Sequence, residues 1–245
     1  TTPPVKEGKL QLNLSDRTAI LAKLAFNERP QNAHDIPKTV LAAFEPSAIA
    51  QRQAAMNSNV NLQNQISEKL LQNLFPFQVE GVKCAIRRNG RILIADEMGL
   101  GKSLQALAAV SFYRLEWPLL IVAPASMVAN WREQVFYWIP DLPKEQVQVI
   151  FDGKVEALTG DITIMSYDLS VRLADLIKKR QFRVIVADEC HALRNSTTKR
   201  SKTMVPILQA AQRVILLSGT PALSRPYELH PQISVINPKL FPKSH

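Results

Sequence analysis

From Leu74 onward, short apolar runs alternate with stretches that have apolar residues at helical spacing. The runs are rich in β-branched residues and strand-sized, and they occupy residues 91–96, 118–124, 147–152, 161–167, 183–189 and 213–219. The helical patterns lie at residues 102–115, 126–139, 168–179 and 197–211. Continuous apolar strands separated by helices predict an α/β domain, with a mostly parallel sheet covered by helices on both faces. Ligands bind beyond the carboxyl ends of such strands, where every unusual motif of this chain lies.

The first 70 residues have a different pattern. The stretch LSDRTAILAKLAF (14–26) combines a Ser/Asp start signal with apolar residues at helical spacing, which predicts a helix. Residues 49–69 are rich in Gln, Asn and Ala, and prolines interrupt the segment between them at Pro30, Pro37 and Pro46. We interpret residues 1–70 as an N-terminal extension, partly helical or a poorly ordered linker, before a domain of residues 71–245.

Composition limits the class of protein. Hydrophobic residues make up 46% of the 245 residues, which is enough for a buried core. No apolar run approaches the roughly 18 residues of a membrane helix, so we expect no membrane partner. The two cysteines, Cys84 and Cys190, form no C-x-x-C pair. This argues against a disulfide framework or a zinc site and favours a reducing intracellular compartment.

The chain is basic, with a net charge of +9 and a pI of about 9.7. This balance favours an acidic partner, of which nucleic acid is the commonest, and a basic solvated surface without a ligand explains it equally. Three basic clusters stand out, namely Arg87, Arg88 and Arg91, then Lys178, Lys179 and Arg180, then Arg194, Lys199, Arg200 and Lys202. Each of them is also typical of a solvated helix end, but we expect the last cluster to lie near DNA because it follows the acidic motif (183–191).

The stretch LIADEMGLGKS (93–103) ends as a phosphate-binding loop does, but Asp96 stands where the usual pattern has its first glycine. A strand, a glycine turn and a helix start make an anion site, because free N–H groups and the helix dipole point at the ligand. Gly99 and Gly101 let the backbone curl around a phosphate. Lys102 is predicted to reach the β- and γ-phosphates, and Ser103 to hold Mg²⁺. The alternative is an ordinary strand-to-helix turn that contains Gly-Lys-Ser.

A second acidic motif, RVIVADECH (183–191), ends another apolar run. Hydrolysis of a magnesium-bound nucleotide needs a carboxylate near the metal and a base that orients water. Asp188 suits the first role and Glu189 the second, and the alternative is a helix N-cap beside a solvated charge. His191 is either a satisfied polar residue or a relay to the next motif. Cys190 has no base partner in sight, so we interpret it as a packing residue.

Two further motifs lie at the end of the last predicted strand and before the first. LLSGTP (216–221) ends the last strand, where the hydroxyls of Ser218 and Thr220 suit contact with the acidic motif, and the alternative is a turn built by Gly219 and Pro221. LFPFQ (74–78) precedes the sheet. The two-sided amide of Gln78 suits an adenine edge, although one Gln alone decides nothing.

Seven segments, in order, resemble the first RecA-like lobe of a Swi/Snf-type ATPase of helicase superfamily two. They cover roughly residues 70–243 and read LFPFQVEGV, LIADEMGLGKSLQALA, IVAPASMVANWREQ, IMSYDL, VIVADECHALRN, VILLSGTPALSRPYELHPQI and NPKLFP. The phosphate loop of that family typically reads DEMGLGK[ST], so Asp96 is the family form. Residues 112–142, 189–208 and 218–233 look most like the HARP-type annealing helicases, which act at replication forks, and residues 36–46 look like the segment that joins a HARP domain to the ATPase in those proteins.

The resemblance implies roles for individual residues. The catalytic residues would be Lys102, Asp188 and Glu189, and the metal partners Ser103 and Asp188. The nucleotide would contact Gln78, Asp96, Glu97, Met98, Gly99, Leu100, Gly101, Lys102 and Ser103. Coupling to DNA would involve Ser126, Trp131, His191, Ser218, Gly219 and Thr220. Residues 124–131 and 166–168 would face the DNA backbone, although an aromatic such as Trp131 on a helical face is more often core.

The resemblance also implies an activity. The cofactors would be ATP and Mg²⁺, and the partners DNA, duplex or forked, and a second RecA-like lobe that supplies arginine fingers. We expect the chain alone to hydrolyse ATP slowly or not at all, and the complete motor to be a nuclear, DNA-dependent ATPase of the annealing, fork-remodelling kind. The alternatives are a nucleosome remodeller built on the same lobe and a non-hydrolysing nucleotide- or DNA-binding scaffold. A metabolic kinase or GTPase explains neither SGTP nor NPKLFP.

Overall fold

The computed structural model describes residues 60–63, 65–220 and 226–241. The chain divides into two compact units, residues 1–41 and residues 42–245. The first unit, and with it the helix predicted at 14–26, lies outside the described residues. All described helices and strands belong to the second unit.

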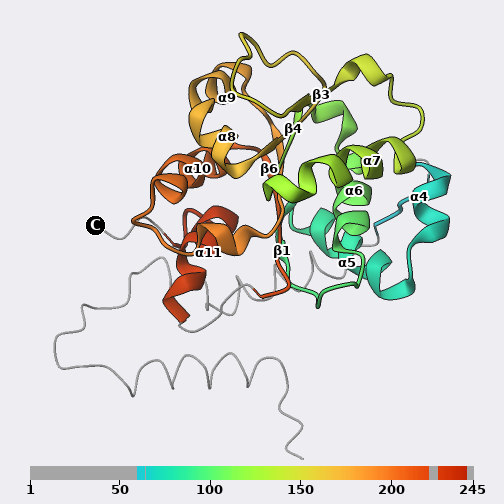
Figure 1. Cartoon of the computed structure of the whole chain (residues 1–245). Coiled ribbons are helices and arrows are strands. Elements are labelled where there is room, and N and C mark those ends of the chain that lie inside the picture. Colours follow the sequence, from blue (N-terminus) through green and yellow to red (C-terminus); the bar gives the residue numbers. More distant parts are fainter. Residues whose placement is uncertain (1–59, 64, 221–225, 242–245) are drawn as a thin grey trace, which may run out of the picture. The chain divides into compact units, whose positions relative to one another are not determined.

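A single parallel sheet forms the centre of this unit (Figure 1). All pairs between its six strands are parallel, in the order β1-β6-β5-β2-β4-β3. Its strands are β1 (Arg91–Ile94), β2 (Leu119–Ala123), β3 (Val147–Ile150), β4 (Ile162–Ser166), β5 (Val184–Ala187) and β6 (Arg213–Leu217). Each predicted apolar run contains one strand, which confirms the predicted sheet.

Helices cover both faces of the sheet, as Figure 1 shows. On one face lie α4 (Glu68–Asn73), α5 (Pro76–Arg87), α6 (Lys102–Phe112) and α7 (Val128–Trp138). On the other lie α8 (Tyr167–Arg172), α9 (Ala174–Arg180), α10 (Lys199–Ala210) and α11 (His230–Ile236). The short 3₁₀ turns are η1 (Arg114–Glu116), η2 (Ala125–Met127), η3 (Lys144–Gln146), η4 (Cys190–Leu193) and η5 (Pro226–Leu229).

Strand periodicity explains why there are two cores. Successive strand residues point to opposite faces of a sheet, so a run of apolar residues supplies both. In β2, Leu119 and Ile121 pack against α4–α7, whereas Leu120 and Val122 pack against α8–α11, and all four are fully buried. The fold therefore rests on the β-branched and leucine-rich runs seen in the sequence.

Two predicted boundaries differ from the structure. The helical pattern at 168–179 forms two helices, because the backbone at Leu173 (φ −101°, ψ 21°) leaves the α-helical conformation between α8 and α9. Near the N-terminal boundary, Leu62, Ile66 and Leu70 are buried in the core beside α4–α7. The compact unit thus begins before residue 71, and α4 itself crosses that boundary.

Arg91 was placed by the sequence in a basic cluster that was either solvated or facing DNA, and the structure corrects this. Its half-buried guanidinium donates to carbonyls at the ends of two helices, Leu208 and Ala211 of the α10 end and Val235 and Ile236 of the α11 end. The last carbonyls of a helix have no partner within it and carry partial negative charge. Arg91 is therefore a shared C-terminal cap for α10 and α11.

Replacing Arg91 with Met is expected to lower the free energy of unfolding by about 2–3 kcal/mol, because hydrogen bonds from a charged donor are lost and carbonyls remain buried without partners. Chemical denaturation of the purified protein measures this. Lys179→Met, on the exposed end of α9, is the matched control and is expected to change stability by less than about 0.5 kcal/mol. Equal stability of the two variants would contradict the capping role.

Candidate active site

The strand order alone brings three motifs together. The phosphate loop follows β1, the SGT turn (218–220) follows β6 and the acidic motif (188–191) follows β5, and these strands are neighbours in the sheet. Ladder contacts continue into the motifs, because the Ser218 N–H donates to the Ile94 carbonyl at 3.2 Å and the Asp188 N–H to the Val122 carbonyl at 2.8 Å. The motifs thus meet at the carboxyl edge of the sheet, as predicted.

The phosphate loop takes a shape that requires glycine. Gly101 precedes α6 with φ 70°, in the left-handed region, and a Cβ there would lie 2.4 Å from the Gln78 side-chain nitrogen. Gly99 has φ 85° and open space where a Cβ would point. A side chain at Gly101 would be both strained and in collision, whereas at Gly99 only the backbone conformation excludes it. The free N–H groups at the start of α6 remain available to an anion.

Lys102 lies over its own loop. Its Nζ donates to the carbonyls of Asp96 at 2.9 Å and Glu97 at 3.0 Å. The Asp96 carboxylate accepts a 2.7 Å bond from Nε2 of Gln105, a buried residue of α6. Asp96, where the usual pattern has glycine, therefore ties the loop to its own helix. The sequence did not point to Gln105, since a glutamine within a helix carries no signal of this role.

Gln78 supports the loop from α5. It is buried, its Nε2 donates to the Leu100 carbonyl at 2.9 Å, and its Oε1 accepts from the Phe75 N–H at 2.9 Å. The amide keeps one further N–H and one further lone pair. Adenine recognition by Gln78 stays a prediction, and it would use those remaining positions.

Three other side chains of the loop are exposed. Glu97, Met98 and Leu100 are exposed, with Met98 at 80%, while Ser103 is half-buried at the start of α6. Their predicted contacts with nucleotide stay predictions.

Two donors hold the Asp188 carboxylate. Its Oδ2 accepts from Nε1 of Trp131 and its Oδ1 from the N–H of Glu189, both at 2.9 Å. Trp131 is fully buried and Asp188 is 7% exposed. The structure thus agrees with the core alternative for Trp131, and it adds a contact to the candidate metal ligand that sequence reasoning missed.

Glu189 continues toward the SGT turn through a histidine. Its backbone is left-handed (φ 47°), which is uncommon for a residue with a side chain. Nδ1 of His191 lies 3.1 Å from the Glu189 Oε2 and 3.2 Å from the Ser218 hydroxyl. Because a carboxylate only accepts, the first contact requires a proton on Nδ1. The three side chains form one polar chain, and a relay role for His191 stays a prediction.

The SGT turn also touches the phosphate loop. A Cβ added at Gly219 would lie 3.0 Å from Cγ of Met98 and 3.6 Å from Nζ of Lys102. The Ser218 hydroxyl accepts a 3.2 Å bond from the Thr220 N–H, and Ser218 is fully buried while Thr220 is exposed. The turn therefore adjoins both the loop and the acidic motif.

The segment after β4 reaches the acidic motif from the other side. The Tyr167 hydroxyl donates to the Asp188 carbonyl at 2.8 Å, and burial raises the pKa of Tyr167 well above its ordinary value, so the hydroxyl stays a donor. Arg200 lies 5.5 Å from the Tyr167 ring and its Nη2 is 2.9 Å from the Asp168 carboxylate. Of the third basic cluster, Arg200 is thus occupied within the protein rather than simply solvated.

Cys190, next to the acidic residues, is a packing residue, as the sequence predicted. It is buried and its thiol lies 3.2 Å from Oε1 of Gln232. Burial, together with the neighbouring carboxylates of Glu189 and Asp188, raises the pKa of this thiol far above its usual range. A protonated thiol is a poor nucleophile.

A family model for the SNF2-related domain matches residues 50–245. The chain belongs to the SNF2-related domain family. The resemblance predicted from the seven segments is confirmed, and the fold is that of the RecA-like ATPase lobe of this helicase-like family.

Two relatives are similar over most of this SNF2-related chain. SWI/SNF-related matrix-associated actin-dependent regulator of chromatin subfamily A-like protein 1 of Xenopus laevis is 44% identical over 98% of this chain and 25% of that protein. DNA annealing helicase and endonuclease ZRANB3 of Homo sapiens is 41% identical over 76% of this chain and 18% of that protein. The chain therefore spans a quarter or less of the length of these relatives.

A solved structure supports the family fold. The SWI2/SNF2 ATPase core of Sulfolobus solfataricus, in complex with double-stranded DNA, matches with a TM-score of 0.61 and 27% identity. The match covers 73% of this chain and 38% of that chain.

The basic clusters of this SNF2-related lobe lie at opposite edges of the sheet. Arg87 and Arg88 end the α5 region just before β1 begins, and Lys178–Arg180 end α9 just before β5 begins. A helix that ends where a strand starts ends at the amino edge, away from the site. Only the cluster from Arg194 to Lys202 follows the acidic motif at the carboxyl edge.

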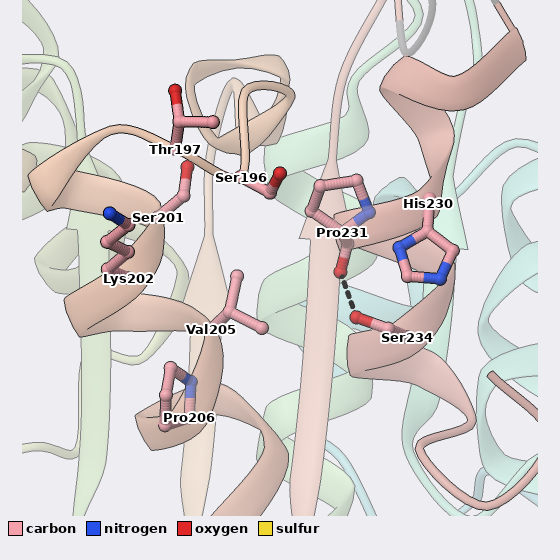
Figure 2. A pocket seen from close by; sticks show the side chains of 9 residues that line it. All are labelled: Ser196, Thr197, Ser201, Lys202, Val205, Pro206, His230, Pro231 and Ser234. Atoms are coloured by element: carbon pink, nitrogen blue, oxygen red, sulfur yellow. Dashed lines mark hydrogen bonds between the residues drawn. The ribbon is translucent and has the colours of Figure 1, made fainter. Parts of the chain in front are cut away.

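A groove adjoins that third cluster. It has a volume of about 420 Å³ and lies between α10 and α11, with Lys202 on one wall and His230 on the other (Figure 2). Ser196 and Thr197 of the turn before α10 line it too, and Arg194 lines a hollow beside it. Inside the groove, the Ser234 hydroxyl donates to the Pro231 carbonyl at 2.7 Å. DNA contact by this cluster stays a prediction.

Within the described residues, no group of three His, Cys, Asp or Glu side chains is arranged to hold a metal ion. The same part of the chain contains no helix that is long and apolar enough to cross a membrane.

Proposed function

We propose that this chain is the ATP-binding lobe of a DNA-dependent motor that hydrolyses ATP and rewinds or remodels forked DNA. One observation carries the proposal: the phosphate loop, the Asp188–Glu189 pair and the SGT turn meet at a single edge of the sheet, and a polar chain joins Glu189 to Ser218. A scaffold that only bound nucleotide would need neither the carboxylate pair nor that chain.

The residues present fit ATP and Mg²⁺. The loop offers free N–H groups at the start of α6, open space beside Gly99 and the ammonium of Lys102 for phosphate oxygens. Mg²⁺ prefers oxygen ligands and is usually held by one or two protein groups together with phosphates. The Ser103 hydroxyl and the Asp188 carboxylate are such groups. Once bound, the ion would neutralise charge on the β- and γ-phosphates.

In the proposed reaction, Glu189 orients a water molecule for attack on the γ-phosphorus. The new bond joins the water oxygen to phosphorus, the bond between the γ-phosphorus and the bridging oxygen breaks, ADP leaves, and Glu189 receives the water proton. Lys102 stabilises charge on the phosphates. His191 lies between Glu189 and Ser218, so a change in the SGT turn when phosphate leaves would move the base.

We infer that full activity needs a second RecA-like lobe. The matched stretch is 25% of one relative and 18% of the other, and the match covers 38% of the chain of the Sulfolobus ATPase core. Arginine fingers from a partner raise phosphoryl-transfer rates by about 10³–10⁵ in comparable enzymes. This lobe alone is therefore expected to hydrolyse ATP slowly or not at all.

DNA is the proposed polymer partner, bound through its backbone. The similar ATPase core from Sulfolobus is in complex with double-stranded DNA. On this chain, Ala125 and Ser126 of η2 are exposed at the carboxyl edge, where the Arg194–Lys202 cluster also lies, and the net charge is +9. Contacts to phosphates bind without regard to sequence and weaken with salt. Such a motor would work in the nucleus.

Rewinding is the proposed activity because one relative is named a DNA annealing helicase. The other relative is named a regulator of chromatin, which supports the second candidate, a nucleosome remodeller. A strand-annealing assay separates the two. The full-length protein with ATP is expected to close a protein-coated single-stranded bubble in duplex DNA, monitored by fluorescence quenching of paired dyes. Sliding of nucleosomes without bubble closure would favour the remodeller instead.

A further inference from the structure

We propose that Trp131 is a positioning residue that holds the Asp188 carboxylate ready for Mg²⁺ and links it to the exposed turn η2. The inference rests on the proposed function, in which Asp188 is a metal ligand. It goes beyond that function because it gives a buried side chain of α7 a part in metal binding.

The indole of Trp131 has a single hydrogen-bond donor, and this donor contacts Asp188. Trp131 is fully buried, and its single polar atom, Nε1, lies 2.9 Å from Oδ2 of Asp188. An indole N–H only donates, so in this hydrogen bond the Asp188 carboxylate is the acceptor. Oδ1 is fixed by the Glu189 N–H at 2.9 Å. A carboxylate has about four lone-pair positions, so two remain for the ion or for its water shell.

The β2–α7 segment holds Asp188 twice. The last part of β2 accepts the Asp188 N–H through the Val122 carbonyl at 2.8 Å, and α7 supplies the indole to the side chain. Between them lies η2, whose Ala125 and Ser126 are exposed. Trp131 is in the first turn of α7, which starts at Val128 directly after η2. The indole that holds the carboxylate therefore lies one helical turn from η2.

This arrangement orients a ligand from a distance. Groups that hydrogen-bond a metal ligand fix its orientation, and their removal typically costs about 10–100-fold in metal affinity or activity. Without the indole N–H, the Asp188 carboxylate is free to rotate about its remaining bond to Glu189. Phe at position 131 keeps an aromatic ring in the buried space but has no donor.

The test compares Trp131→Phe with Trp138→Phe in the full-length protein. Trp138 is the matched control, because it lies on the same helix and its Nε1 also makes a 2.9 Å bond, to Gln134, away from the acidic motif. The affinity for a non-hydrolysable ATP analogue is measured with and without Mg²⁺. Mg²⁺ is expected to increase the affinity of the unchanged protein for the analogue. In Trp131→Phe this increase should be about 10–100-fold smaller, while the affinity without Mg²⁺ should be unchanged. Trp138→Phe should keep both.

A double variant separates positioning from loss of packing. In Asp188→Asn, Mg²⁺ should no longer increase the affinity for the analogue. Adding Trp131→Phe to this variant should therefore cause no further loss. A further loss in the double variant, or an equal loss of Mg²⁺-free affinity in Trp131→Phe, would show a packing role and overturn the inference. If Trp131→Phe does not fold, the indole N–H resonance of Trp131 in the folded wild-type protein serves instead. It should shift when Mg²⁺-nucleotide binds, and no shift would overturn the inference.

Failure of the proposed function gives a different result. If the unchanged protein binds the analogue no more tightly with Mg²⁺ than without it, the proposed function fails. If Mg²⁺ increases the affinity of the unchanged protein and of Trp131→Phe by the same factor, only the positioning role of Trp131 fails.

Discussion

Glu189→Gln is expected to lower DNA-stimulated ATP hydrolysis by about 10²–10⁴-fold, the usual contribution of a general base. The amide has nearly the same shape as the carboxylate but accepts no proton. ATP binding should persist, since the phosphate loop and the hydrogen bonds of Asp188 do not involve the Glu189 side chain. Steady-state hydrolysis and equilibrium binding of labelled ATP by the full-length protein measure the two effects separately.

Glu156→Gln is the control for this substitution. Glu156 is exposed between β3 and β4, and its replacement should leave hydrolysis unchanged. Hydrolysis by Glu189→Gln within a few-fold of the unchanged protein would rule out Glu189 as the base. Loss of ATP binding together with hydrolysis would show that the substitution disturbs the site rather than the chemistry.

Lys102→Ala is expected to weaken ATP binding and to lower hydrolysis by about 10²–10³-fold, as the loss of a charge-stabilising donor does in other enzymes. The Lys102 ammonium donates to two carbonyls of its own loop. Glu97 is exposed and Asp96 only half-buried, so water can replace these contacts and the free energy of unfolding should change by less than about 0.5 kcal/mol. Hydrolysis rates, ATP affinity and chemical denaturation together check this.

Lys154→Ala is the matched control, because Lys154 is an exposed lysine between β3 and β4. It removes the same charge from the chain but should change neither hydrolysis nor ATP affinity. Normal ATP affinity in Lys102→Ala would contradict the assignment of the phosphate loop.

The sheet was predictable because burial on both faces imposes continuous apolar runs. Strands β2 (Leu119–Ala123) and β5 (Val184–Ala187), for instance, contain no polar residue. The break between α8 and α9 was not predictable from spacing, because Leu173 and Ala174 are both buried and continue the apolar pattern through the break. The apolar pattern of a sequence reports which residues are buried. Here the residues stay buried at the point where the backbone leaves the helical conformation.

The principal candidate residues of the site could be picked out in the sequence because each belongs to a short motif after a strand. Asp188 and Glu189 come directly after β5, and Gly101 and Lys102 lie where the glycine-containing turn that follows β1 meets α6. The residues that orient them could not, because their roles depend on contacts distant in sequence. Trp131 meets Asp188 across 57 positions, and its apolar surroundings hide its one donor.

Arg91 and Tyr167 illustrate the same limit in two ways. The sequence placed Arg91 among surface charges, yet it lies across the ends of two helices that are more than 100 positions away. Tyr167 lies in a predicted DNA-facing segment, and its hydroxyl instead reaches the Asp188 carbonyl. In each case the polar group is satisfied by main-chain carbonyls, which any residue can supply and no motif marks.

The measurement that tests the central proposal most directly is ATP hydrolysis by the full-length protein at one salt concentration, without DNA and with single-stranded, duplex, forked and nucleosomal DNA. We expect the protein to hydrolyse little ATP without DNA, to be strongly stimulated by forked DNA, and to lose that stimulation in Glu189→Gln. Hydrolysis that no DNA stimulates, or stimulation that survives Glu189→Gln, would contradict it.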